Sequence, residues 1–206
     1  NDAIDARRDL AVGRADKPVA RGEITARAVA LAAGVALVVA LALSALLGAG
    51  FLLAHTVALA SAWAYNAWLK HTAASVLPFV VSFGLFPSLA TLAEPVPTLA
   101  AGWAGIAGSA LGVAVHFSNV LPDLDDDAAT GVRGLPHRIG ARGSALIAFG
   151  ALLVGALAVL LGPVLDGAAL QPVAVIGTIT VVVIGAFGLR GVVGGGRSGG
   201  CLLYTS

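Results

Sequence analysis

The sequence contains no methionine and almost no cysteine. Its one cysteine, Cys201, excludes a disulfide framework, a cysteine-ligated zinc site and an iron–sulfur cluster. Charge is also scarce, because only 11% of the 206 residues are charged, whereas a soluble domain has about 25%. A formal net charge of +1 provides no basic surface for binding nucleic acid. Residue 1 is an asparagine inside a charged segment, so we expect the chain to begin within a longer protein.

What the sequence does contain is long apolar stretches, since 58% of the residues are hydrophobic. About 20 apolar residues are needed to span a bilayer as a helix. Six stretches satisfy this condition and predict an all-α, multi-pass bundle in the lipid bilayer. They cover about residues 25–47, 51–69, 73–93, 98–121, 144–162 and 170–189. Short glycine- and proline-containing breaks separate several of them and indicate turns.

The charged residues are confined to particular connections. Residues 1–24 and 122–143 hold nine of the eleven acids. With six alternating spans, all twelve Lys and Arg residues fall on one side, and only Glu94 and Asp166 lie in the opposite connections. Cytoplasmic connections are enriched in Lys and Arg. We therefore predict a protein of the cell (inner or plasma) membrane with both polar segments on the cytoplasmic face.

The two polar segments resemble each other when the chain is shifted by 118 residues. Six identities result over 22 positions, and they predict an internal duplication: Asn1 and Asn119, Asp5 and Asp123, Asp9 and Asp127, Gly13 and Gly131, Pro18 and Pro136, Gly22 and Gly140. Four predicted helices separate the copies, and an even number returns the second copy to the same face. This arrangement is a parallel repeat, which would allow both acidic patches to face one cavity.

The end of the chain differs from the rest. We expect residues 1–193 to form one membrane domain, with its acidic loops at 1–24 and 119–143. The segment 194–206, GGGRSGGCLLYTS, contains no span and breaks from the preceding composition. We expect this tail to be non-native.

The acidic residues have spacings that suit a metal ion. Asp2, Asp5 and Asp9 are three and four residues apart, which places their carboxylates along one face of a helix. In the second segment, Asp123 and Asp127 are four apart, and Pro122 is expected to start or kink the local helix. Carboxylate oxygens without cysteine ligands favour Mg²⁺, which completes its coordination with water and phosphate oxygens.

Basic residues in the same loops indicate an anionic partner. Five of them are placed to supply counter-charge: Arg14, Lys17, Lys70, Arg133 and Arg138. A diphosphate fits this combination of metal and basic groups best. If it belongs to an isoprenoid, its hydrocarbon tail would lie among the apolar helices while the head group sits at the cytoplasmic rim.

On these motifs the chain resembles the UbiA-type intramembrane prenyltransferases. The family's N-D-x-x-D-x-x-x-D motif matches residues 1–9, followed by Gly13-Arg14 and Lys17-Pro18. Its second motif, D-x-x-D-D-x-x-x-G with a basic residue two positions on, matches residues 123–133. The tyrosine and lysine at the end of an intervening helix match Tyr65 and Lys70. The resemblance covers residue 1 to about 190.

The resemblance implies a nine-helix, Mg²⁺-dependent enzyme, of which this chain would hold the third to eighth helices. Metal ligands carried over from the family would be Asn1, Asp5, Asp123 and Asp127, supported by Asp2 and Asp9. Diphosphate would be held by Lys70, Arg14 and Arg133, and we add Lys17 and Arg138 from their positions. Asp5, Asp127 and Lys70 are the expected catalytic residues.

The activity implied is transfer of a prenyl group from a polyprenyl diphosphate to a small aromatic acceptor such as a hydroxybenzoate, as in quinone or related isoprenoid lipid biosynthesis. Departing diphosphate would be stabilised by Mg²⁺ and basic groups, and an electron-rich acceptor would attack the allylic carbon in a site closed to water. A non-aromatic or other lipid acceptor is an alternative. No obligatory protein partner is evident.

A cation-coupled transporter is the alternative from another class, because a parallel repeat can enclose a central path. Transport usually needs ionisable groups near the bilayer midplane, whereas these acids gather at one rim. A CDP-alcohol phosphotransferase is disfavoured because its D-G-x-x-A-R motif is absent.

Three further residues are candidates for contacting the acceptor or supporting the site, namely Tyr65, His116 and Asn119. A helix-packing hydrogen bond is an equal alternative for His116. Lys70 has an alternative too, as a lysine that reaches the membrane interface beside an aromatic belt containing Trp63 and Trp68.

Overall fold

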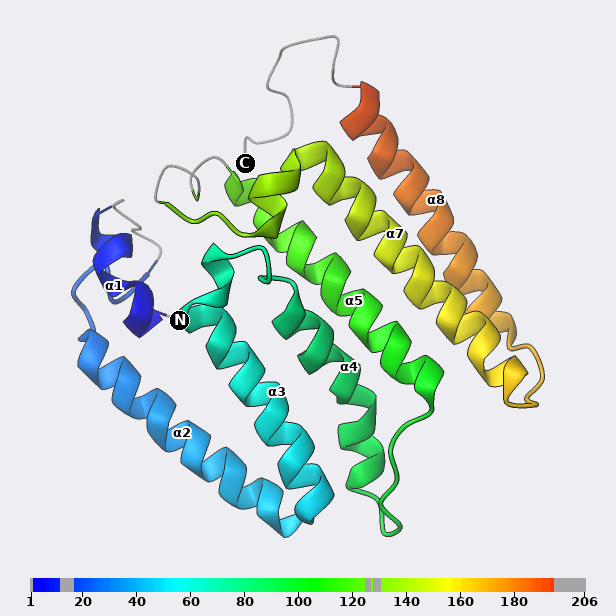
Figure 1. Ribbon diagram of the computed structural model, residues 1–206, viewed down its shortest axis with the longest axis horizontal. Coiled ribbons are helices and arrows are strands. Elements are labelled where there is room, and N and C mark those ends of the chain that lie inside the picture. Colours follow the sequence, from blue (N-terminus) through cyan, green and yellow to red (C-terminus); the bar gives the residue numbers. More distant parts are fainter. Residues whose placement is uncertain (1, 12–16, 125–126, 128–130, 195–206) are drawn as a thin grey trace.

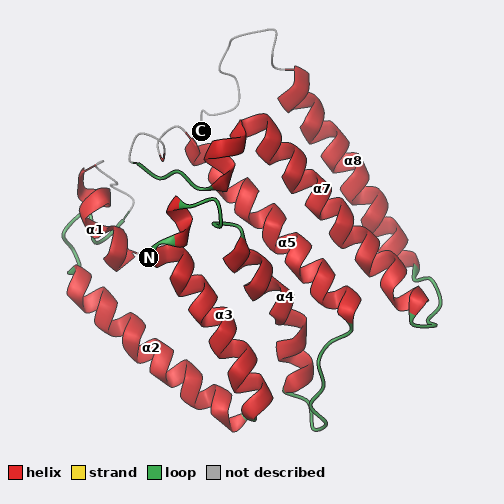
Figure 2. Cartoon of the chain, in the orientation of Figure 1, coloured by secondary structure: helices red, strands yellow, loops and turns green. Residues whose placement is uncertain are grey.

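The protein is all-helical throughout the part of the chain that the computed structural model describes, which comprises residues 2–11, 17–124, 127 and 131–194 (Figure 2). The predicted fold class is therefore confirmed. In chain order, the elements are α1 Asp2–Ala11, α2 Ala26–Leu46, α3 Ala49–Ala67, the 3₁₀ helix η1 Leu69–His71, α4 Leu77–Leu92, α5 Gly102–Val120, the 3₁₀ helix η2 Leu121–Asp123, α7 Leu135–Leu165 and α8 Pro172–Gly194 (Figure 1).

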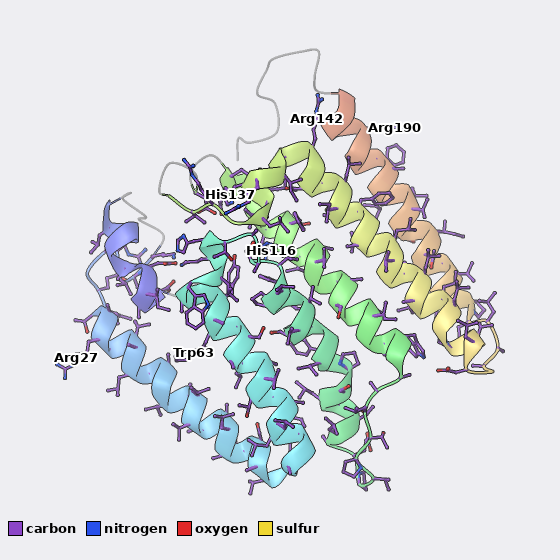
Figure 3. The ribbon with its side chains drawn as sticks, in the orientation of Figure 1. Arg27, Trp63, His116, His137, Arg142 and Arg190 are labelled. Carbon is purple, nitrogen blue, oxygen red and sulfur yellow. The ribbon has the colours of Figure 1, made fainter. Side chains whose placement is uncertain are left out.

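The six long helices α2, α3, α4, α5, α7 and α8 form a row in which each packs against its neighbours in the chain (Figure 1). One end of this row, which we call the motif end, carries α1, η1, η2 and the start of α7. The turns from α2 to α3, α4 to α5 and α7 to α8 lie at the opposite end, the far end. Glu94 and Asp166 lie in far-end connections, whereas Arg27, Arg142 and Arg190 lie at the motif end (Figure 3). The predicted separation of charge is thus present in the fold.

Three of the predicted spans are long and apolar enough to cross a membrane, judged by length and composition. They are Ala26–Leu46, Gly102–Asp123 and Leu135–Leu165. Two further apolar helices, Leu77–Leu92 and Pro172–Gly188, are shorter. Helix α3 has 19 residues, but polar residues including His55, Tyr65 and Asn66 interrupt its apolar sequence.

The outer surface of the bundle is apolar, and several polar side chains are inside it. Leu46 is 82% exposed and Val173 is 76% exposed. By contrast, Ser75, His116 and Ser144 are almost completely buried. This distribution reverses that of a soluble protein and suits a bundle whose helices face hydrocarbon and whose polar groups are satisfied inside.

Two of the predicted boundaries were wrong. The fifth span was expected to start at residue 144, but α7 begins at Leu135, so part of the predicted polar loop is helical. Pro136 lies in the first turn, where N–H groups have no acceptor within the helix, so its missing N–H costs no hydrogen bond. Helix α4 begins at Leu77 because residues 69–76 form η1 and a connection that holds Lys70 inside the protein.

The predicted internal repeat is visible in the backbone. Gly22 and Gly140, which coincide under the shift of 118 residues, have φ angles of 76° and 80°, a region that favours glycine. Gly140 kinks α7, and the helix then continues to Leu165. The same shift places the bounds of α2 on residues 144 and 164, so α2 corresponds to the part of α7 that follows the kink.

Glycines allow α4 and α5 to approach closely. A Cβ atom at Gly108 would overlap the carbonyl oxygen of Phe83, and one at Gly112 would overlap that of Phe79. Small residues at such crossings let helix backbones approach in membranes. Gly188 in α8 serves no such approach, because a Cβ atom there would meet open space.

Candidate active site

The first acidic motif forms helix α1 and is held by lysines from elsewhere in the chain. The Nζ atom of Lys70 lies 2.5 Å from Oδ1 of Asp5, and these side chains are only 8% and 7% exposed. Asp2, one turn earlier on α1, has its Oδ1 atom 3.3 Å from Nζ of Lys17. Asp2 and Asp5 therefore share a face of α1 as predicted, and a lysine compensates each carboxylate.

Lys70 therefore does not reach the membrane interface, which was the alternative to a role in the site. It lies in η1, and η1 begins directly after Trp68, the C-cap residue of α3. Trp63 and Trp68 are exposed, as expected for an aromatic belt. The ammonium group of Lys70 points instead into the protein, where it donates a hydrogen bond to Asp5.

An exposed ion pair lies in the connection between α1 and α2. Nε and Nη2 of Arg21 donate to the two carboxylate oxygens of Glu23 at 2.7 and 2.9 Å. These hydrogen bonds hold the pKa of Glu23 below its ordinary value. Such an exposed pair contributes little to stability, so we assign it no part in the site.

The second acidic motif begins where α5 ends. Pro122 lies in η2 together with Asp123, so the expected change of helix at this proline is confirmed. The backbone carbonyl of Asp127 accepts a hydrogen bond from Val132 N at 2.9 Å. Its carboxylate Oδ2 lies 3.7 Å from Nε2 of His137, which places the motif beside the first turn of α7.

Two candidate diphosphate ligands follow this motif. Arg133 is exposed and precedes α7, and Arg138 is exposed in the first turns of that helix. Nε of Arg138 donates to the carbonyl oxygen of Arg133 at 3.4 Å. Both guanidinium groups are therefore at the motif end with Lys70.

The segment that joins η1 to α4 brings the two motifs together. Oγ of Ser75 accepts a hydrogen bond from Leu135 N at 2.9 Å. A Cβ atom added at Gly134 would lie 2.8 Å from the carbonyl oxygen of Lys70. Lys70 thus contacts the first motif through its side chain and the end of the second through its backbone.

The three candidates for acceptor contact differ in their surroundings. His116 is 1% exposed, and its Nε2 atom is 3.1 Å from Oγ of Ser75. The rings of Tyr65 and Phe79 lie 5.9 and 4.8 Å from its imidazole centroid. These contacts favour the helix-packing alternative for His116, whereas Asn119 is exposed at the end of α5.

Sequence reasoning missed Ser75 and His137. Ser75 is a lone serine in a short connection and has no local signal. His137 was identifiable as the histidine in the second polar segment, directly after Pro136. Within the described residues, the buried side-chain nitrogen and oxygen atoms without a hydrogen-bond partner are Nδ1 of His116 and both ring nitrogens of His137.

Some predicted site residues lie outside the described residues, namely Asn1, Arg14 and the side chain of Asp9. Across the part of the chain that is described, no three side chains of His, Cys, Asp or Glu converge on a point where a metal ion would bind. At the motif end, the donors among the described residues are hard carboxylate oxygens from Asp2, Asp5, Asp123 and Asp127. Their chemistry suits Mg²⁺.

Two apolar cavities lie within the row of helices. One of about 590 Å³ is bounded by α4, α5, α7 and α8, with Trp103, Leu152 and Thr178 in its lining. The other, of about 570 Å³, lies between α4, α5 and α7. Neither is lined by a residue of the acidic motifs, so the expectation that both patches face one cavity is not met by these two.

The sequence was compared with known proteins. The profile of the UbiA prenyltransferase family matches residues 1–196. No curated protein and no solved structure matches the chain. The family match covers both acidic motifs and all six long helices, and the chain therefore belongs to the UbiA prenyltransferase family.

Proposed function

We propose that this membrane prenyltransferase transfers a prenyl group from a polyprenyl diphosphate to an aromatic acceptor resembling 4-hydroxybenzoate, in quinone or related isoprenoid lipid biosynthesis. The observation that carries the proposal is the buried ion pair between Asp5 and Lys70. It joins the first acidic motif to a basic residue whose backbone carbonyl lies close to Gly134, the residue directly after the second motif. This pair supports a site in which acidic and basic groups act together at one end of an apolar bundle.

Mg²⁺ is the proposed cofactor, and hard oxygen donors at the motif end support it. The residues that would hold it are Asn1, Asp5, Asp123 and Asp127, with Asp2 and Asp9 in support. When bound, the metal would neutralise charge on the diphosphate. Diphosphate would otherwise be held by Lys70, Arg14, Lys17, Arg133 and Arg138.

The ion pair suggests how the site receives its substrate. Without substrate, Lys70 neutralises the carboxylate of Asp5, which would be costly to bury alone. An arriving diphosphate offers Lys70 a new partner and leaves Asp5 as an oxygen donor. Lys70 then stabilises charge that develops on the leaving diphosphate as the bond between the allylic carbon and oxygen breaks. The acceptor ring forms the new carbon–carbon bond and then loses a proton.

The test uses the full-length protein in liposomes. We expect a prenyl diphosphate to bind in the presence of Mg²⁺ and not in EDTA, and we expect Asp5→Ala or Asp127→Ala to abolish binding and transfer. Glu94→Ala is the matched control, because Glu94 is an exposed acid at the far end. Metal-independent binding, or no binding, would instead favour cation transport, to be examined by flux assays. Near-normal transfer by either motif variant would contradict a site shared by the two motifs.

Acceptor and orientation need separate measurements. Transfer from one prenyl diphosphate to 4-hydroxybenzoate, other phenols and non-aromatic lipids will identify the acceptor class. We propose that the motif end faces the cytoplasm, because lysines and arginines gather there. Arg133→Cys and Glu94→Cys, each made with Cys201 replaced, should be labelled by an impermeant thiol reagent from opposite sides of the membrane.

A further inference from the structure

Ser75 is the point at which three elements of the motif end meet. It lies in the connection between η1 and α4 and is 1% exposed. Its Oγ atom accepts a hydrogen bond from Leu135 N in α7 and is 3.1 Å from Nε2 of His116 in α5. A single hydroxyl group thus links the segment that carries Lys70 to two helices.

The bond to Leu135 replaces a helix cap that the sequence does not provide locally. Gly134 is the N-cap residue of α7 and has no side chain to accept from the first turn. A side chain is excluded there, because a Cβ atom at Gly134 would lie 2.8 Å from the carbonyl oxygen of Lys70 and 3.0 Å from Oγ of Ser75. Ser75 therefore caps α7 from another part of the chain.

The hydroxyl group of Ser75 also has a second partner, on another helix. Oγ accepts a hydrogen bond from Leu135 N and forms a second hydrogen bond with Nε2 of His116, in which the imidazole tautomer decides the donor. His116 is buried among aromatic rings, including that of Phe117 at 5.4 Å, and cannot move aside easily. The serine is consequently fixed from both sides.

We propose that Ser75 is a positioning residue for prenyl transfer, which sets Lys70 relative to Arg133. Lys70 lies five residues before Ser75, and Arg133 lies two residues before Leu135. Both are diphosphate ligands in the proposed function, on which this inference rests. Ser75 itself does not touch the substrate; it fixes the spacing between two basic groups that do.

The first test is Ser75→Ala in the full-length protein, with the Kd for a prenyl diphosphate and the kcat of transfer measured in Mg²⁺. We expect the Kd to rise about tenfold, the scale of one lost hydrogen bond. Ser88→Ala is the matched control. Ser88 is also buried, in α4, and its Oγ accepts from Ala100 N at 3.2 Å toward the far end. This control should change the unfolding midpoint but not the Kd.

Two further variants separate positioning from general stability. Gly134 has φ −66° and ψ −177°, which alanine adopts without strain. Gly134→Ala should therefore raise the Kd only by pushing the Lys70 segment away from α7. Ser75→Cys keeps a weak donor and acceptor, and we expect it to restore part of the affinity.

A double-mutant cycle with Lys70→Met decides whether Ser75 acts through Lys70. In the Lys70→Met background, Ser75→Ala should weaken prenyl diphosphate binding little further. The same tenfold loss in both backgrounds, or a Kd for Ser75→Ala equal to that of Ser88→Ala, would overturn the inference. If the unsubstituted protein binds no prenyl diphosphate, the proposed function itself fails, which is a separate outcome.

Discussion

The buried pair between Asp5 and Lys70 makes a quantitative prediction about stability. At 2.5 Å and an effective dielectric constant of about 20, the attraction between unit charges is about 7 kcal/mol. Removing both groups from water costs several kcal/mol per ion, which offsets this attraction. The intact pair is therefore expected to add little to the free energy of unfolding, although it contributes strongly to the motif end's structure.

Breaking the pair has a different result from removing it. Asp5→Asn or Lys70→Met leaves an uncompensated charge among buried groups, and each should lower the free energy of unfolding by about 3–5 kcal/mol. The double variant Asp5→Asn/Lys70→Met leaves no such charge. We expect it to be more stable than either single variant, while transfer activity is lost in all three.

The assay is equilibrium unfolding in mixed detergent micelles, followed by tryptophan fluorescence. Trp63 and Trp68 lie just before the segment that carries Lys70 and report on the motif end, while Trp103 reports on the far end. If the double variant lost as much free energy of unfolding as the two single variants together, the argument from an uncompensated buried charge would be refuted. Single losses below about 1 kcal/mol, the range of exposed pairs, would show that the pair is solvated rather than buried.

Three other predictions concern the bundle. Gly112→Ala should lower the free energy of unfolding by about 1–3 kcal/mol through overlap with α4, whereas Gly34→Ala in α2, where a Cβ meets open space, should be neutral or slightly stabilising in the same unfolding assay. Ser44→Ala should lower it by about 1 kcal/mol, because Oγ of Ser44 is 2.6 Å from Nδ1 of His55. The pKa of Glu23 is lowered in the folded state by its hydrogen bonds from Arg21. The ionised carboxylate therefore adds a small stabilisation above its ordinary pKa, and this stabilisation is lost as the pH falls through the lowered pKa. The unfolding midpoints of the parent and of Glu23→Gln should converge in acid.

The sequence predicted the helices well because a helix that crosses the hydrocarbon needs a long apolar stretch, which is easily read from composition. Each of the six apolar stretches overlaps one helix, and the turn at Gly48 has the expected glycine backbone, with a φ of 105°. The repeat was also readable, since the same polar residues and glycines recur at one spacing. Errors arose where helices extend into polar sequence, as α7 does at Leu135. At such places the helical hydrogen bonding extends beyond the apolar stretch from which the helix was predicted.

The site was predictable only in part, for a physical reason. Carboxylate spacing on a helix is a local property, so the shared face of Asp2 and Asp5 could be read from the chain. The pairing of Asp5 with Lys70 joins residues 65 positions apart, and no periodicity encodes such a contact. The roles of Ser75 and Gly134 depend on the approach of two loops, which is set by the packing of α5 against α4 and α7.

The arrangement at the motif end explains why a lysine is suited to position 70. An arginine would carry a planar fork that matches a carboxylate by two bonds and holds it firmly. Lysine offers a compact charge on a flexible stem, which can leave Asp5 for a diphosphate oxygen with a small movement of its end. Its backbone carbonyl, meanwhile, lies so close to Gly134 that a Cβ atom there would overlap it. In the proposed function, a movable charge on a buried lysine would allow one residue to compensate Asp5 and, with substrate bound, to neutralise the leaving diphosphate.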